Sequence, residues 1–287
     1  MTDYSQSPIG IRDITSIEEM GAVEELQREV WACADVDVVP RMMLHPAREV
    51  GGTLVGAYDG ARLVGFAFGF VGLERGRLVL HSHMLAVKPE YRGRALGSCL
   101  KLAQRERALA EGIKLMTWTF DPLQSRNAHL NFARLGVVSD SYRVNYYGDI
   151  STSPLHRATG TDRLWVTWHL DSPRVLNRIN SARAAAESVR DELERAAPLV
   201  RFGADGSPVV KRLTEAAHGG LVTIEIPDDI DALREQDAEV ALRWRAATRD
   251  AFQSALAEGY VVEEFFRVER DGRRGGAYLL RRLKGDG

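Results

Sequence analysis

The stretch from Arg77 to Gly112 constrains the fold more than any other part of the chain. An alternating pattern predicts a strand over 77–87, and after a turn at Lys88-Pro89-Glu90 a helical run continues to Gly112. The small residues of Arg92-Gly93-Arg94-Ala95-Leu96-Gly97 leave backbone N–H groups uncovered where that helix begins. These donors and the helix dipole favour an anion, above all a phosphate, and the two arginines add fixed positive charge. The stretch therefore predicts a pyrophosphate-binding turn, with an ordinary β–α turn and solvated arginines as the alternative.

Further apolar runs before and after this stretch predict strands joined by tight turns. Asp59-Gly60 is typical of a hairpin turn, and a capping box at Ser16-Ile17-Glu18-Glu19 predicts the start of a helix. The strands over 77–87 and 114–120 are expected to be parallel, because a helix lies between them. Consecutive hairpins over 52–87 disfavour a doubly wound nucleotide-binding fold, which needs strand–helix units from the start. The predicted order is strand 9–14, helix from 16, strands 52–58, 62–73 and 77–87, helix to 112, strand 114–120, helix 125–135, and a strand or pair within 137–150.

Composition sets limits on the class of protein. The chain of 287 residues has a formal net charge of −2 and 45% apolar residues, which is typical of a soluble globular protein with room for two small domains. Nothing in the charge pattern indicates a nucleic-acid or membrane partner. The N-terminus lacks the basic and apolar regions of a signal peptide, and the apolar run over 63–73 is too short to span a bilayer. The cysteines, Cys33 and Cys99, have no metal-ligand spacing and are interpreted as free thiols in the cytoplasm.

The segment Arg92–Gly97 resembles motif A of the GNAT acyltransferases, whose pattern is Gln/Arg-x-x-Gly-x-Gly/Ala directly after a strand and at the start of a helix. Arg92 and Gly97 match this pattern, and Ala95 stands where the first glycine is usual. The predicted element order is also the order of this family over residues 8–150. The resemblance implies an α+β (mixed α/β) fold with a GNAT-like central mixed sheet in which two parallel strands splay apart. It also implies acetyl-CoA or another acyl-CoA, such as succinyl-CoA, as cosubstrate, and no metal.

In the resembling family the pantetheine arm lies in the notch between the splayed strands. Mapped onto this chain, the notch lies between Met84–Val87 and Trp118–Phe120. The backbone N–H of Leu85 or Val87 is then the oxyanion donor, a role typically worth on the order of a hundredfold in rate. The amide and carbonyl of Val87 are expected to pair with the pantetheine arm. The cofactor-binding residues that motif A implies are Arg92, Gly93, Arg94, Ala95, Leu96 and Gly97.

His81 and His83 are the candidate general bases. They lie two residues apart on one predicted strand, so their side chains share a face. A histidine with a pKa of about 6.5 is well suited to accept a proton near neutral pH. His83 ranks first because it is nearer the notch. The alternative for both residues is a packing role with hydrogen-bonded rings.

The predicted helix over 125–135 resembles motif B of the same family. Asn127 matches an asparagine that contacts coenzyme A or fixes the loop, and both Asn127 and Phe132 are assigned to the cofactor site. Phe132 stands where a tyrosine usually protonates the departing thiolate. His129, or a tyrosine of Asn145-Tyr146-Tyr147-Gly148, is a candidate substitute, with strand packing as the alternative for the tyrosines.

The connection over 33–51 contains two prolines and is expected to carry acceptor recognition, as loops on a rigid scaffold commonly do. Arg41, His45 and Arg48 are candidates for binding a carboxylate of the acceptor. The alternative is that the arginines are solvated.

The polar segment over 151–162 predicts a boundary. It separates an acyl-CoA-binding domain over 8–150 from a C-terminal α+β extension over 163–284. In the extension we expect strands at 163–170, 221–226, 260–268 and 277–283, and helices at 173–196 and 230–258. A structural or dimerising role is favoured, which leaves a homodimer open, over a decayed repeat of the first half.

We therefore predict an acyl-CoA-dependent N-acyltransferase that acts on a small amine or amino acid by direct transfer in a ternary complex. The alternative is a coenzyme A-binding regulatory or scaffolding protein with little or no turnover. The resemblance carries part of this prediction, because a fold alone does not fix a reaction.

Overall fold

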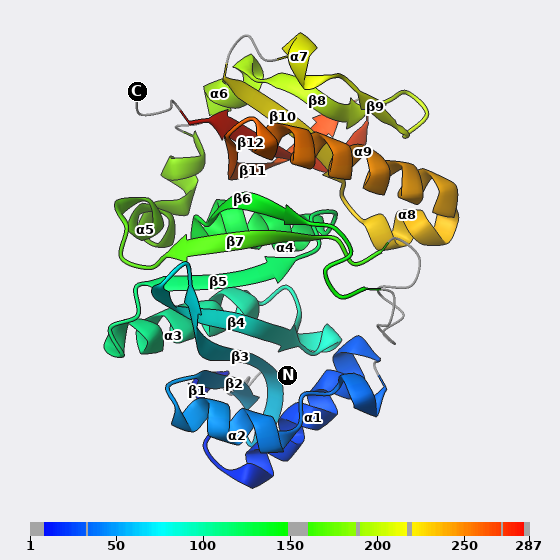
Figure 1. Ribbon diagram of the computed structural model, residues 1–287. Helices are drawn as coiled ribbons and strands as arrows, with labels where there is room; N and C mark the ends of the chain where they lie inside the picture. Colours follow the sequence, from blue (N-terminus) through cyan, green and yellow to red (C-terminus); the bar gives the residue numbers. More distant parts are fainter. Residues whose placement is uncertain are drawn as a thin grey trace, which may run out of the picture. The chain divides into compact units, whose positions relative to one another are not determined.

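The computed structural model describes residues 9–32, 34–148, 160–187, 190–216, 220–270 and 272–283 (Figure 1). These residues form two compact units, and the chain passes from the first to the second after Trp118, within β5 (Leu115–Phe120). The predicted boundary over 151–162 lies mostly outside the described residues, as does Cys33. The division into domains 8–150 and 163–284 therefore stays a prediction. In the described part of the chain, no helix is long and apolar enough to cross a membrane.

The strands of the first unit run in the order β1-β2-β3-β4-β5. The first four pair antiparallel with their neighbours, and β5 pairs parallel to β4, as predicted. The strand over 77–87 has the bounds that the sequence predicts, and Gly60, at φ +59°, makes the hairpin turn between β2 and β3. The elements are β1 (Gly10–Asp13), α1 (Ile17–Trp31), η1 (Asp35–Asp37), α2 (Arg41–Glu49), β2 (Thr53–Asp59), β3 (Arg62–Glu74), β4 (Arg77–Val87), η2 (Pro89–Tyr91) and α3 (Leu96–Ala110).

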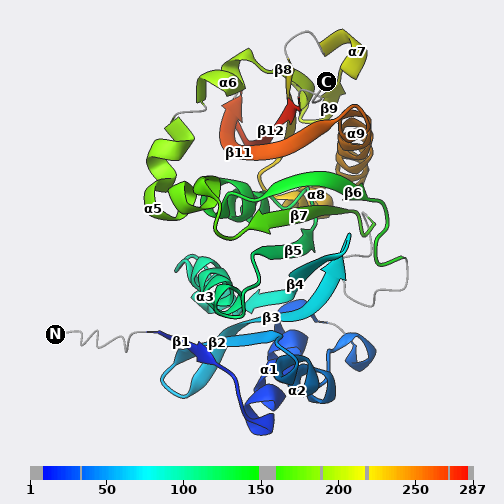
Figure 2. The ribbon, with the colours of Figure 1, turned by 60° about the vertical axis from the view of Figure 1, so that its left-hand side comes forward.

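Helices cover both faces of this sheet (Figure 2). Residues of α1 and α2, among them Met20 and Leu44, share one core cluster with Phe66, Phe68 and Met84 of the sheet. On the opposite face, Leu96 and Leu100 of α3 share a core cluster with strand residues that include Val55 and Val64. The predicted capping box starts α1: the Ser16 hydroxyl accepts from the Glu19 amide, and the Glu19 carboxylate accepts from the Ser16 amide.

The long connection over 33–51 is shorter than the sequence suggests, because Arg41–Glu49 form helix α2. Pro40 precedes the helix as its N-cap residue, and Pro46 lies inside it. A proline is tolerated in or near the first turn, where backbone donors lack intrahelical partners. Pro40 therefore marks the start of the helix, whereas Pro46, its sixth residue, leaves one backbone donor missing inside it.

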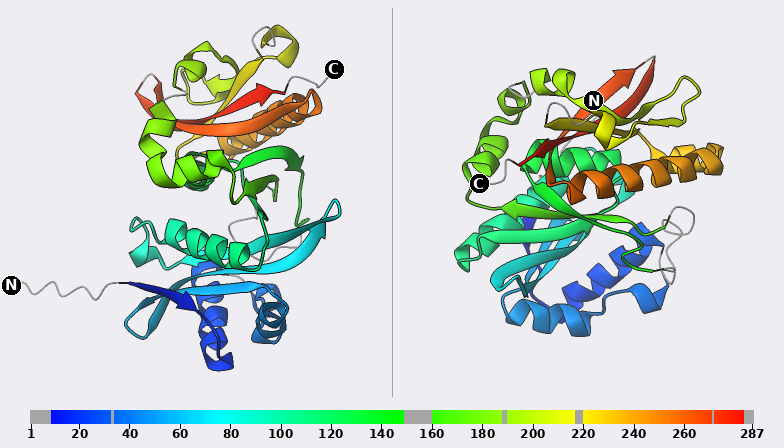
Figure 3. Two further views of the ribbon diagram at one scale, coloured as in Figure 1. Left: turned by 90° about the vertical axis from the view of Figure 1, so that its left-hand side faces the viewer. Right: turned by 45° about the horizontal axis from the view of Figure 1, so that its top comes forward.

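The strands of the second unit run in the order β7-β6-β11-β12-β10-β8-β9. Helix α9 packs along this sheet (Figure 3) and contributes Trp244, Phe252 and other buried residues to its core. The elements are α4 (Ser125–Ala128), the π-helix η3 (His129–Leu135), β6 (Val138–Arg143), β7 (Arg163–His169), α5 (Pro173–Glu187), α6 (Arg190–Arg195), β8 (Ala197–Phe202), β9 (Pro208–Val210), α7 (Leu213–Ala216), β10 (Leu221–Pro227), α8 (Ile230–Gln236), α9 (Ala238–Ala257), β11 (Tyr260–Arg270) and β12 (Arg273–Arg282).

One prediction for the second unit needs correction. The single helix over 230–258 is two helices, because Asp237 adopts an extended conformation and its carboxylate accepts from the amide of Val240 as the N-cap of α9. The predicted helix over 173–196 is described as α5 up to Glu187 and as α6 from Arg190, and residues 188–189 between them lie outside the described residues. Strands β8 and β9 were not predicted, since both are short and carry no alternating pattern.

Candidate active site

The turn between β4 and α3 provides an open group of backbone donors. Gly93 and Ala95 both have positive φ angles, +81° and +58°, so the chain turns sharply before the helix begins. Ala95 is the N-cap residue of α3, and no side chain among the described residues caps this helix end. A methyl group built at Gly93 would meet nothing within 4 Å. No side chain of the described residues therefore competes for the first amides of α3, which fits a diphosphate such as that of coenzyme A.

Positive charge surrounds this turn. Arg92 and Arg94 are exposed, and in the described part of the chain no carboxylate pairs with either guanidinium. Arg94 lies over the ring of Tyr91, with its guanidinium carbon 5.1 Å from the ring centroid, and Arg62 lies 5.8 Å from the same centroid. The Tyr91 hydroxyl donates to Asp59 at 2.7 Å, which fixes the ring under the arginines. The ring of Tyr91 thus supports the Arg94 guanidinium beside the turn, where an anion would bind.

Strands β4 and β5 pair in their N-terminal parts. In the described residues two residue pairs are in register, Leu80↔Met116 and His81↔Thr117. On its other edge β4 continues to pair with β3 as far as Val87. Within the described residues, the part of β4 after His81 is therefore registered with β3 alone. This is the fork that the resemblance predicts at the end of the two parallel strands.

A β-bulge lies at this fork. The register between β3 and β4 shifts between Phe68↔Met84 and Phe70↔His81, so Ser82 and His83 together oppose Gly69. His83 and Met84 consequently both lie on the α1/α2 side of the sheet, since each is close to Phe68 or packs in its cluster. Strict alternation along the strand does not predict this change of face.

The two histidines lie together, as the sequence predicts. Their ring centroids are 6.3 Å apart, and that of Phe70 lies 5.3 Å from His81 and 5.8 Å from His83. The Nδ1 atom of His81 lies 3.1 Å from the hydroxyl oxygen of Thr117. Burial, then the neighbouring His83 and Lys101, lowers the pKa of His81 to about 4. The side chain of His83 is exposed, yet the protein atoms around it still remove enough water to lower its pKa.

The predicted oxyanion and pantetheine contacts, Leu85 and Val87, lie in β4 after the bulge. Leu85 and Val87 pair with Ala67 and Gly65 of β3, and both side chains pack on the α3 side of the sheet. The carbonyl of Val87 accepts from Nε of Arg92 at 3.3 Å. This carbonyl can receive a pantetheine amide on its second lone pair or after Arg92 turns toward a phosphate.

A chain of buried polar groups lies on the α3 side of the fork, and the sequence analysis did not assign it a role. Lys101 donates to the Ser82 hydroxyl at 2.7 Å, and Ser82 donates to Oε1 of Gln104 at 2.7 Å. Nε2 of Gln104 in turn donates to the hydroxyl of Thr53 at 3.0 Å. A signal was present in the sequence, because Lys101 and Gln104 stand at helical spacing beside the apolar residues of α3.

The motif B residues lie in the second unit. Asn127 is exposed on α4, whereas Phe132 is fully buried and packs against Phe120 and Tyr278, with centroid distances of 6.2 and 5.7 Å. Phe132 has no exposed surface, so it reaches a cofactor only if its neighbours move. His129 stands in the π-helix, and burial, followed by Arg267 and Arg134, lowers its pKa. Tyr146 and Tyr147 are partly exposed and pack edge to face at 4.9 Å.

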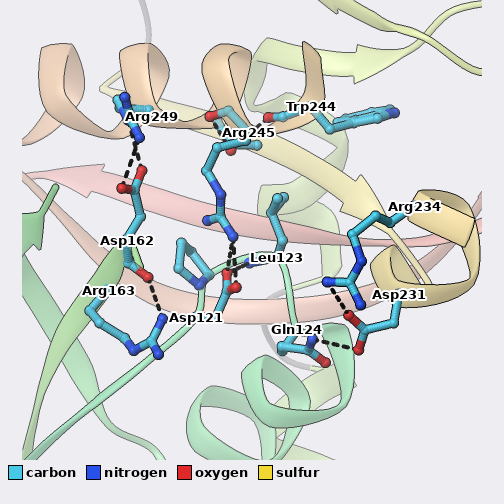
Figure 4. A network of polar contacts seen from close by, with 12 residues as sticks. Asp121, Leu123, Gln124, Asp162, Arg163, Asp231, Arg234, Trp244, Arg245 and Arg249 are labelled. Atoms are coloured by element: carbon cyan, nitrogen blue, oxygen red, sulfur yellow. Dashed lines mark hydrogen bonds and ion pairs between the residues drawn. The ribbon is translucent and has the colours of Figure 1, made fainter. Parts of the chain in front are cut away.

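A set of ion pairs around α9 gives the second unit its buried polar framework (Figure 4). Nη2 of Arg245 donates to both carboxylate oxygens of Asp121, at 2.8 and 2.6 Å. Arg249 binds Asp162 through two nitrogens, with Nε 2.8 Å from Oδ2 and Nη2 2.9 Å from Oδ1. The Tyr278 hydroxyl donates to the carbonyl of Pro122 at 2.6 Å. The bonds of Asp121 and Pro122 join this part of the chain to α9 and β12, more than a hundred positions later.

The candidate carboxylate-binding residues are already paired. Arg41 binds Glu24 through two guanidinium nitrogens, and Arg48 binds Glu49 at 2.9 Å. His45 stands in α2 with its Nδ1 atom buried and unbonded. In the described residues, no group of three or more His, Cys, Asp or Glu side chains is arranged to hold a metal ion. Cys99 is an exposed free thiol.

Comparison with known proteins gives the class. The model of the acetyltransferase (GNAT) family matches residues 20–137, which include β4, the turn, α3 and β5. Residues 20–137 therefore carry a GNAT acetyltransferase domain, the domain of N-acetyltransferases whose cosubstrate is an acyl-coenzyme A. No curated protein matches the chain.

Several solved structures that align with about half of this chain are acetyltransferases. The ribosomal-protein-S18-alanine N-acetyltransferase of Escherichia coli is 13% identical with a TM-score of 0.44, covering 57% of this chain and 95% of its own. A GNAT-family acetyltransferase of Streptococcus pneumoniae is 14% identical with a TM-score of 0.46, covering 55% and 98%. The PaiA N-acetyltransferase of Thermoplasma acidophilum, in complex with coenzyme A, is 16% identical with a TM-score of 0.38, covering 56% and 98%. Likenesses at this level carry no argument about the acceptor.

Proposed function

We propose that this chain transfers an acyl group directly from acyl-CoA to a small amine. The observation that carries the proposal is the start of α3, where among the described residues no side chain caps the helix and no carboxylate binds Arg92 or Arg94. It lies at the end of a strand that forks from its parallel neighbour. A diphosphate on the α3 amides would lay the thioester along β4 after the bulge. The cosubstrate supplies an activated acyl group, and the protein has to position it and accept a proton.

His83 is the proposed general base. A neutral amine attacks the thioester carbonyl carbon, the C–S bond breaks, and the proton lost from nitrogen passes to His83, directly or through one water. A backbone N–H of β4 after the bulge, that of Leu85 or Val87, stabilises the oxyanion. The sulfur leaves as a thiolate, whose usual pKa of about 8.5 makes protonation helpful but not obligatory. Gly93, Ala95, Leu96 and Gly97 contribute the backbone of the diphosphate site, and Asn127 stays a proposed cofactor contact.

Electrostatics around the histidines favours a cationic acceptor. Residues 17–50, which form the α1/α2 layer on the histidine side of the sheet, contain eight acidic and three basic residues, a formal net charge of −5. Arg41 and Arg48, the candidate carboxylate ligands, are bound to Glu24 and Glu49. An ammonium ion is attracted by such a surface and by the aromatic face of Phe70, whereas a second carboxylate is not. We therefore propose a small amine in preference to an amino acid.

Release of free thiol tests the function. The wild-type protein is incubated with acetyl-CoA or succinyl-CoA and a panel that pairs each simple amine with the corresponding amino acid. We expect thiol release that depends on the amine and is faster with the amine than with its carboxylated partner. Binding of coenzyme A without thiol release across the panel would instead support a regulatory protein.

Binding of coenzyme A tests the diphosphate site separately. Arg92→Ala and Arg94→Ala are each expected to weaken binding in calorimetry by about tenfold, the usual worth of one charge-assisted hydrogen bond. Arg243→Ala removes an exposed guanidinium of α9 and serves as the control. Equal affinities of all three variants for coenzyme A would show that the turn does not bind the diphosphate.

A further inference from the structure

The side chain of Lys101 reaches both strands at the fork. Its Nζ atom donates to the Ser82 hydroxyl of β4 at 2.7 Å and lies 3.6 Å from the ring centroid of Trp118 in β5. The last registered pair of the two strands is His81↔Thr117. Lys101 therefore contacts the first residue of each strand beyond that pair, from the α3 side of the sheet.

The same contacts hold the β-bulge. Ser82 is one of the two bulge residues, and its hydroxyl is bound on both sides, by Lys101 and by Gln104. Gln104 continues the network to Thr53 of β2. A Cβ atom at Gly69, opposite the bulge, would lie 3.0 Å from the His81 carbonyl oxygen and 3.3 Å from Gln104 Nε2. The absence of a side chain at Gly69 is what leaves room for the network.

Packing alone does not account for a lysine at this position. The side chain is 3% exposed, and none of the carboxylates in the described residues pairs with it. Burying an amine costs free energy that a methionine of similar length would not cost, and burial lowers the pKa of Lys101 well below its ordinary value although the amine contacts a hydroxyl and an indole face. Lys101 instead holds one residue on each strand, Ser82 of β4 and Trp118 of β5.

We propose that Lys101 is a positioning residue for acyl transfer. By bridging Ser82 and Trp118 it sets the bulge and the opening of the fork, and so directs the His83 side chain and the backbone N–H groups that follow. Its catalytic consequence rests on the proposed acyltransferase function, whereas its effect on the strands does not. The diphosphate turn follows Val87, after the bulge, and contains neither Ser82 nor Trp118.

Four variants test the proposal. Lys101→Met keeps the length of the side chain and removes both contacts of the amine, and Ser82→Ala removes only the hydroxyl. Ser82→Thr retains a hydroxyl and is the matched rescue. Lys114→Met removes an exposed lysine just before β5 and is the control. Each is measured for kcat, for the KM of acyl-CoA, and for amide hydrogen exchange in β4 and β5.

We expect Lys101→Met and Ser82→Ala to lower kcat by at least about tenfold with KM for acyl-CoA nearly unchanged, because small misplacements of reacting groups are costly. Amides of β4 after Ser82 should exchange faster, while those of β1 and β2 keep their protection. Ser82→Thr and Lys114→Met should resemble the wild type. Wild-type kcat and exchange in a folded Lys101→Met protein would overturn the proposal, and so would a loss of kcat that only follows the folded fraction.

Two further outcomes are also decisive. If Lys101→Met does not fold, the comparison of Ser82→Ala with Ser82→Thr decides, since a difference in kcat between them at equal stability supports the proposal and its absence overturns it. If the wild-type protein shows no turnover with any amine, the proposed function has failed. Hydrogen exchange in β4 and β5 then decides whether Lys101 holds the fork.

Discussion

The imidazole rings of His81 and His83 lie 6.3 Å apart, centroid to centroid, on the same side of β4. Both have a lowered pKa, mainly because burial disfavours the charged ring. At neutral pH both rings are therefore uncharged and able to accept a proton. His81 is held beside Thr117, whereas His83 is exposed at the fork, which distinguishes a supporting residue from a candidate base.

Replacement of His83 should separate these roles. We expect His83→Gln to lower kcat by roughly 10²- to 10⁴-fold, the usual contribution of a general base, and His81→Gln to have a smaller effect. Because the pKa of His83 lies below its usual value, the acid limb of kcat/KM in the wild type should fall below pH 6.5. Steady-state rates across pH measure both effects. An unchanged kcat in His83→Gln, or a larger loss in His81→Gln, would contradict this assignment.

His81 should also make stability depend on pH. Its pKa is about 4 in the folded protein and 6.5 as a model value, so the unfolded chain binds more protons between these limits. The stabilisation is complete above pH 6.5 and is lost as the pH falls toward 4. We expect about 2 kcal/mol less free energy of unfolding from this group at pH 5 than at pH 7.5. Urea unfolding of His81→Gln, which lacks the titration, should show a correspondingly smaller decrease than the wild type.

Ala95 adopts a left-handed conformation, with φ +58° and ψ 12°, that glycine adopts more readily. An L-residue in this region costs roughly 1–2 kcal/mol, which the greater freedom of glycine in the unfolded chain offsets in part. We expect Ala95→Gly to raise the free energy of unfolding by about 0.5–1 kcal/mol and not to weaken coenzyme A binding. Ala246→Gly, on the exposed face of α9, should instead lower it by about 1 kcal/mol. Thermal unfolding and calorimetry test the pair, and a less stable Ala95→Gly protein would refute the interpretation.

The Asp121–Arg245 pair should be essential to the second unit. The side chain of Arg245 is 4% exposed, so Asp121→Asn would leave a buried charge with its carboxylate partner removed (Figure 4). We expect a loss of about 3–5 kcal/mol in denaturant unfolding. The double replacement Asp121→Leu, Arg245→Met should recover part of it. Removal of the exposed pair Arg282–Glu258 should change stability by less than about 1 kcal/mol, and similar effects for the two pairs would refute this account.

Local patterns were sufficient to predict much of the first unit. The alternation over 77–87 predicts β4 with its bounds, and the capping box at Ser16 predicts the start of α1. The parallel pairing of β4 and β5 follows from the helix between them. These features depend on residues close in sequence, where spacing and propensity decide the conformation.

Features that depend on partners far along the chain were not predicted. The bulge at Ser82 and His83 exists because β3 offers one residue, Gly69, opposite two. Lys101 looks like a solvated helix residue until Ser82 and Trp118 are placed beside it. Helix α8 ends at Gln236 because Asp237 is extended and caps α9, whereas a continuous helix through Asp237 is the competing conformation. Sequence spacing alone carries no information about such competition.

The passage from one compact unit to the next within β5 has a consequence for dissecting this enzyme. The family-matched segment ends at residue 137, yet Phe132 within it packs on Tyr278, and Tyr278 in turn donates to Pro122. A polypeptide trimmed at the family boundary would leave these aromatic surfaces and the carboxylate of Asp121 unmatched. The segment that matches the acetyltransferase family is therefore shorter than the segment that has to fold together with it. The C-terminal half of the chain cannot be removed without exposing these contacts.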